Sequence, residues 1–99
     1  MTGKHILVAG KVQGVGFRYF TAGHANRLGL TGWTRNLTDG RVEILAFGQP
    51  SSLQSFLDVI REGPPYSEVS GLVVSDAEAT EVLKDFSIRP NGGGAWPEK

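Results

Sequence analysis

The sequence predicts an α+β domain in which two helices cover one face of a mainly antiparallel sheet. Five short apolar runs and two stretches of helical periodicity follow one another as strand, helix, strand, strand, helix, strand and a short final strand. Because each helix connects two strands of the same sheet, both helices are expected on the same face. The length of 99 residues suits one such domain with a single core. This order of elements, βαββαβ, is that of the ferredoxin-like two-layer sandwich.

The first half of the chain is expected to form a strand, a helix and a β-hairpin. Residues 5–12 are apolar on both faces, which is typical of a central strand. Residues 17–28 have helical periodicity, and the apolar side is made by Phe17, Phe20, Ala25 and Leu28. Residues 30–37 and 41–47 have the character of strands, and the dipeptide Asp39-Gly40 between them is a strong hairpin signal.

The second half of the chain is expected to form a helix and two further strands. The helix begins near Ser51, which has the capping-box spacing with Gln54, and it ends at Gly63. Its apolar positions follow the i, i+3, i+4, i+7 rule and are Leu53, Phe56, Leu57 and Ile60. Strands follow over residues 67–75 and 84–89, and a polar connection separates them.

The predicted domain covers residues 1–89, and residues 90–99 are predicted to form a flexible, glycine-rich C-terminal tail. Pro90 is followed by Asn91 and three glycines, and this run breaks all periodicity. With Met1 at one end and this tail at the other, we expect a free-standing protein.

The composition narrows the possible functions. The absence of cysteine excludes disulfides, thiolate catalysis and cysteine-based metal sites, and no Asp/Glu cluster suggests a two-metal phosphatase. The net charge of zero creates no field of one sign that would draw the chain to nucleic acid or to an anionic membrane. No apolar run approaches the ~18 residues of a membrane span, and the start of the chain lacks the apolar core of a signal peptide. We therefore expect a soluble, cytoplasmic, monomeric protein that needs no metal or other cofactor.

The stretch from Val8 to Phe20 is the most informative part of the chain. An apolar strand ends at Gly10, a loop with two further glycines follows, and a helix then begins with Arg18 in its first turn. Glycines let a ligand approach the backbone, and the unpaired N–H groups at the start of a helix attract anions. The loop fits neither the G-x-x-x-x-G-K-[ST] motif nor the G-x-G-x-x-G motif. Two interpretations remain open on these residues alone: an anion cradle, or a tight strand-to-helix turn.

Four segments resemble the acylphosphatases, small enzymes that hydrolyse the carboxyl–phosphate bond of acyl phosphates. They are G-K-V-Q-G-V-G-F-R at 10–18, L-G-L-T-G-W-T-R-N at 28–36, D-G-R-V-E at 39–43 and G-P-P-Y-S-E-V at 63–69. The chain departs from the usual family pattern at Lys11, at Thr34 and in its C-terminal tail.

The resemblance implies a function and a set of site residues. It implies cleavage of acyl phosphates to a carboxylate and inorganic phosphate by direct attack of water, without a metal. Its catalytic residues would be Arg18, which binds the phosphate, and Asn36, which orients the attacking water. The phosphate cradle would be made by Gln13, Gly14, Val15, Gly16, Phe17 and Arg18. The partners implied are a small-molecule acyl phosphate as substrate and inorganic phosphate as product and competitive ligand, with no nucleic acid and no membrane.

The chemistry of these residue types agrees with that implication. A carboxylate is a good leaving group, so the site needs positioning and neutralisation of phosphoryl charge more than it needs a strong general acid. The planar guanidinium of Arg18 suits two phosphate oxygens. The amide of Asn36 can accept from water and donate to phosphate, whereas a carboxylate there would repel the substrate. Strand alternation puts Asn36 on the same face as Thr34 and opposite Arg35.

Ordinary structural roles are also available for several of these residues. Without the family resemblance, Asn36 would be interpreted as a turn former and Arg18 as a solvated surface charge. We expect a surface salt bridge for Arg35, an exposed position for His5, and no catalytic role for His24. Trp33 and Phe17 are expected to be core residues rather than platforms for a substrate.

Two other functions can be distinguished by further observations. An RNA-binding module on this fold would carry an aromatic motif on a central strand, which residues 41–47 lack, and its binding would depend on salt. A silent regulatory domain, or a domain of a larger enzyme, is the second alternative. The presence of both Arg18 and Asn36 argues against a silent copy.

Overall fold

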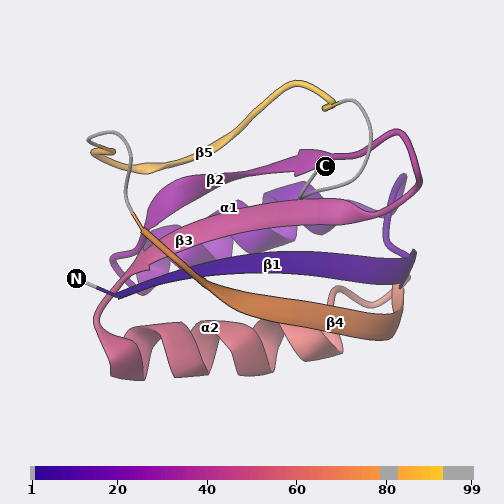
Figure 1. Cartoon of the computed structure of the whole chain (residues 1–99). Helices are drawn as coiled ribbons and strands as arrows, with labels where there is room; N and C mark the ends of the chain where they lie inside the picture. Colours follow the sequence, from indigo (N-terminus) through magenta and orange to yellow (C-terminus); the bar gives the residue numbers. More distant parts are fainter. Residues whose placement is uncertain (1, 79–82, 93–99) are drawn as a thin grey trace.

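The structure, a computed structural model, describes residues 2–78 and 83–92, and Figure 1 shows the arrangement of its helices and strands. In chain order the elements are β1 (Thr2–Lys11), α1 (Phe17–Arg27), β2 (Thr31–Asn36), β3 (Val42–Gly48), α2 (Pro50–Glu62), β4 (Glu68–Ala77) and β5 (Phe86–Ile88). The predicted order of elements and the α+β fold class are therefore confirmed. β1 begins earlier than predicted because residues before His5 still pair with β3 and β4.

The sheet has the strand order β4-β1-β3-β2-β5. β1 pairs antiparallel with both β3 and β4, and β2 pairs antiparallel with β3, so the sheet is mainly antiparallel as predicted. β5 is the parallel exception and adds to the free edge of β2, with Gly32 opposite Phe86 and Thr34 opposite Ile88. The loop after β1 and the turn between β2 and β3 lie at the same end of this sheet (Figure 1).

The core lies between the sheet and the two helices. Ile6 and Val8 of β1 and Ile44 of β3 are fully buried there. The four predicted positions of α2 are all buried, which confirms its apolar face: Leu53, Phe56, Leu57 and Ile60. On α1 the buried side is made by Phe17, Thr21 and Ala25, while Phe20 and Leu28 are only partly buried against the same core.

The predicted capping box of α2 is not formed. Pro50 is already within the helix, and Gln49 is the N-cap, with an extended backbone and no side-chain hydrogen bond. The fixed φ of proline favours the first helical positions, so the helix begins before Ser51 can act as a cap. The end of α2 at Gly63 agrees with the prediction.

The end of the chain is described only in part. Residues 90–92 run beside β2, where Leu37 and Gly92 form an isolated parallel bridge. The predicted polar connection includes residues 79–82 and the predicted tail includes residues 93–99, and both of these segments lie outside the described residues. The division into a domain over 1–89 and a tail over 90–99 stays a prediction.

Candidate active site

The glycine loop begins with a β-bulge at the end of β1. The pairing of β1 with β4 shifts register between Ala9 and Gly10, and Gly10 has a φ of 123°. A bulge of this kind bends a strand and redirects the chain that follows it. The two loop glycines, Gly14 and Gly16, have φ values of 73° and 78°, which residues with a side chain rarely adopt. A Cβ at either glycine would meet no atom within 4 Å, so both face open space that a ligand can enter.

The first turn of α1 is suited to an anion. Gly16 is the N-cap and provides no side-chain cap, and the first turn contains no acidic residue. Backbone N–H groups at the start of a helix carry partial positive charge, and no carboxylate of this first turn competes for them. Arg18 adds a full positive charge in the same turn.

A pocket of about 200 Å³ lies at this end of the molecule. It is lined by Val12, Gly14, Gly16, Phe17, Arg18, Tyr19 and Asn36. The structure thus brings Arg18 of α1 and Asn36 of β2 to one pocket, although 18 positions separate them in the sequence. Of the predicted cradle residues, Gln13 and Val15 are not in the lining. Phe17 is buried, as predicted, but also forms part of the pocket wall.

Asn36 is held at the end of β2 from both sides. It pairs with Val42 of β3, and its carbonyl oxygen accepts a hydrogen bond from the amide of Gly92 at 2.8 Å. Strand alternation was expected to place Asn36 on the face of Thr34, and Thr34 is fully buried opposite Ile44 of the core. The face of β2 that covers the core is therefore also the one that meets the glycine loop.

Gln13 joins the glycine loop to the turn that follows Asn36. Its Nε2 donates to the carbonyl oxygens of Leu37 at 2.8 Å and Arg41 at 2.9 Å. The same two residues are joined by a backbone hydrogen bond from the Leu37 amide to the Arg41 oxygen. A single side-chain amide thus fixes the loop that bears the glycines against the hairpin that bears Asn36.

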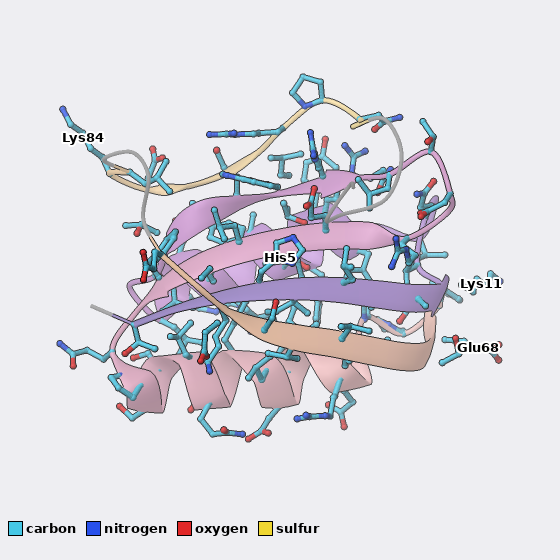
Figure 2. All side chains as sticks on the ribbon, in the orientation of Figure 1. His5, Lys11, Glu68 and Lys84 are labelled. Atoms are coloured by element: carbon cyan, nitrogen blue, oxygen red, sulfur yellow. The ribbon has the colours of Figure 1, made fainter. Side chains whose placement is uncertain are left out.

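The face of the sheet that points away from the helices carries a buried charged cluster, which the sequence analysis did not predict. Glu43 of β3 is completely buried and accepts hydrogen bonds from His5 Nε2 at 2.7 Å and Arg35 Nε at 2.6 Å. Burial alone would raise the pKa of Glu43, but the hydrogen bonds from His5 and Arg35 outweigh it and hold this pKa below its usual value. Figure 2 shows His5 near the middle of the sheet, away from the loop end of β1 that Lys11 marks.

Two expectations about this face were wrong. His5 is 4% exposed rather than exposed, because β1 continues to Thr2 and His5 is an interior position of a central strand. Arg35 does form a salt bridge, but its partner is buried rather than on the surface. Trp33 is buried as expected, with the guanidinium groups of Arg35 and Arg89 over its ring at 5.3 Å and 4.8 Å.

His24 lies outside the pocket lining, and its lack of a catalytic role stays a prediction. Its ring packs edge-on against Phe20 at 4.6 Å, and Arg27 Nη2 lies 3.3 Å from its Nδ1. Burial, and then the charge of Arg27, lower the pKa of His24. Both interactions favour a neutral imidazole on the side of α1.

Within residues 2–78 and 83–92, no group of three or more His, Cys, Asp and Glu side chains is placed to hold a metal ion. In the same part of the chain, neither helix is long and apolar enough to cross a membrane.

A family model described as Acylphosphatase matches residues 4–88. The chain belongs to the acylphosphatase family. It is 49% identical over 88 residues to the acylphosphatase of Archaeoglobus fulgidus. The aligned region covers 89% of this chain and 98% of that relative. The crystal structure of acylphosphatase from Bacillus subtilis has a TM-score of 0.86 and 45% identity over 90% of this chain and 99% of that one.

The acylphosphatase fold also occurs within a longer protein. A crystal structure of full-length HypF, in a phosphate- and nucleotide-bound form, has a TM-score of 0.85 and 32% identity to this chain. The match covers 93% of this chain but 12% of HypF. This chain is therefore similar to one part of a much larger protein as well as to small acylphosphatases.

Three residues of this acylphosphatase site were not predicted in their observed roles. The side-chain bonds of Gln13 and the amide of Gly92 reach across the sheet end, and no local pattern in the sequence indicates either contact. The position of Tyr19 in the pocket lining could have been predicted from the sequence, because Tyr19 directly follows Arg18 in the first turn of the helix.

Proposed function

We propose that this chain hydrolyses the carboxyl–phosphate bond of acyl phosphates, releasing a carboxylate and inorganic phosphate. The observation that carries the proposal is the pocket that joins the glycine loop, Arg18 and Asn36. Membership of the acylphosphatase family supports the same reaction.

The proposed mechanism begins with the phosphoryl group in the loop. Backbone N–H groups of residues 13–18 surround its oxygens, and Arg18 donates to two of them. These donors are fixed before the substrate arrives, so they neutralise the charge that develops on the phosphoryl oxygens in the transition state. In this mechanism the backbone N–H groups and Arg18 stabilise the phosphoryl charge without a metal.

Asn36 completes the reaction by orienting the water. Its amide oxygen accepts a hydrogen bond from the water, and its NH₂ group donates to a phosphoryl oxygen, which aligns the water with phosphorus. Water forms the new P–O bond as the bond to the carboxylate oxygen breaks, and the carboxylate leaves with that electron pair. Inorganic phosphate, which keeps both protons of the water, remains in the loop as product and acts as a competitive ligand.

The test is hydrolysis of benzoyl phosphate without added metal. Arg18→Ala should abolish turnover and weaken competition by phosphate. Arg18→Lys should restore little of this turnover, because an ammonium group cannot make the paired hydrogen bonds of a guanidinium. Asn36→Ala should lower kcat by at least ~100-fold while phosphate still competes. Arg27→Ala and Asn26→Ala are matched controls, because both residues are exposed on α1 and outside the pocket lining.

Two outcomes contradict the proposal. Wild-type rates in Asn36→Ala would remove the water-orienting role. Loss of activity in EDTA with recovery in Mg²⁺ would overturn the metal-free mechanism. We further propose that the protein acts as a cytoplasmic monomer on small molecules; a salt-dependent affinity for single-stranded RNA would contradict the choice of substrate class.

A further inference from the structure

The size of the pocket indicates where the acyl group of a substrate must lie. Pockets that bury most of a drug-sized ligand usually measure ~300–1,000 Å³. This pocket measures about 200 Å³, and its loop glycines, Arg18 and Asn36 are the groups suited to the phosphate. With the phosphate held by these groups, a bulky acyl group extends from it to the rim of the pocket.

Tyr19 is the lining residue with a large, exposed aromatic side chain. Its side chain is 75% exposed, yet it belongs to the pocket lining. The other lining residues with large apolar side chains, Val12 and Phe17, are each 1% exposed and have little surface left for a ligand. An exposed aromatic ring beside a polar cradle offers a flat, apolar face to whatever part of the substrate leaves that cradle.

The charges of the lining also restrict the acyl group. Among the described residues that line the pocket, Arg18 is the only cationic one, and the phosphate occupies it. An acyl group with a second carboxylate would find no cation there, and the face of an aromatic ring carries partial negative charge. The lining thus favours an uncharged acyl group.

We propose that Tyr19 is the acyl-specificity residue, and that the preferred substrates are phosphates of aromatic or bulky apolar carboxylic acids. This inference rests on the proposed function. The ring of Tyr19 stacks on the acyl group, while the phosphate remains in the glycine loop. Stacking needs the ring and not the hydroxyl group, so phenylalanine can replace tyrosine at this position.

The experiment compares kcat/KM for benzoyl phosphate and acetyl phosphate in each variant. Tyr19→Ala should lower the benzoyl-to-acetyl ratio by between about 2-fold and about 12-fold, the range expected for one aromatic contact. Tyr19→Phe should keep the wild-type ratio. Inhibition by inorganic phosphate should be unchanged in both variants, because the phosphate end of the site is intact.

Tyr66 is the matched control. It is 80% exposed and lies outside the pocket lining, so Tyr66→Ala should leave the ratio unchanged. An unchanged ratio in Tyr19→Ala, with normal turnover of both substrates, overturns the role of Tyr19 and leaves the proposed function standing. Failure of the wild type to hydrolyse either substrate overturns the proposed function and this inference with it.

Discussion

Replacement of Gln13 by alanine tests how the two halves of the site are held together. Its Nε2 bonds to the oxygens of Leu37 and Arg41 at 2.8 and 2.9 Å, so Gln13→Ala removes two hydrogen bonds in one step. Each such bond contributes about 0.5–1.5 kcal/mol, which gives a loss of about 1–3 kcal/mol in the free energy of unfolding. For a domain of this size, this loss corresponds to a fall in Tm of at least ~4 °C.

Catalysis should suffer as well as stability in this variant. Without Gln13 the loop that bears the glycines is no longer fixed against the hairpin that bears Asn36. A displacement of ~1 Å between catalytic groups can cost up to ~100-fold in rate, so kcat should fall more than phosphate affinity does. Gln13→Glu should be at least as harmful, because its carboxylate would face the two carbonyl oxygens to which the Gln13 amide donates.

The assays are urea unfolding and steady-state hydrolysis of benzoyl phosphate. Gln54→Ala is the control, because Gln54 is exposed on α2 and donates to the carboxylate of Asp58 at 3.2 Å. Its effect should remain within about 0.5 kcal/mol. A Gln13→Ala protein with the wild-type unfolding midpoint and kcat would refute the reasoning.

Two further predictions concern Glu43 and Gly92. The pKa of Glu43 is lowered in the folded state, so the stability that it contributes is present above about pH 4.3 and is lost as pH falls further; Glu43→Gln should flatten this acid slope in urea titrations. The exposed Glu68→Gln should keep the slope, and an unchanged slope in Glu43→Gln contradicts the prediction. Gly92→Pro removes the N–H that bonds to the Asn36 oxygen and adds a Cβ that would crowd the guanidinium of Arg35, so we expect a loss of at least about 1 kcal/mol in stability together with a lower kcat. Asn91→Ala should change neither quantity, and wild-type behaviour of Gly92→Pro would exclude a role for this contact.

Local patterns predicted most of the fold. The spacing of Leu53, Phe56, Leu57 and Ile60 specified the buried face of α2, because these four side chains occupy one side of a helix whatever it packs against. The dipeptide Asp39-Gly40 placed the hairpin, because a turn depends on a few adjacent residues. The glycine loop was recognised for the same reason.

Local patterns in the sequence could not predict contacts between distant segments. The burial of His5 depends on its pairing with residues of β3 and β4, and its bond to Glu43 joins positions 38 residues apart. The parallel addition of β5 to β2 and the two bonds of Gln13 depend on the same long-range register. The sequence therefore indicated residues that the fold brings to one pocket, but not the residues that hold them in place.

The strand order affects how the enzyme folds as well as how it works. Every described residue that lines the pocket lies between Val12 and Asn36, so the proposed catalytic groups are all synthesised early in the chain. One edge of β1, however, pairs with β4, where Gly3 lies opposite Ala77. The outer edge of β2 receives the hydrogen bond from the Gly92 amide to the Asn36 oxygen. Pairings of such high contact order slow folding, because loop closure costs entropy before the pairing contributes any free energy. Activity should consequently appear late, when the last third of the chain closes the sheet around a site whose described residues all precede Leu37.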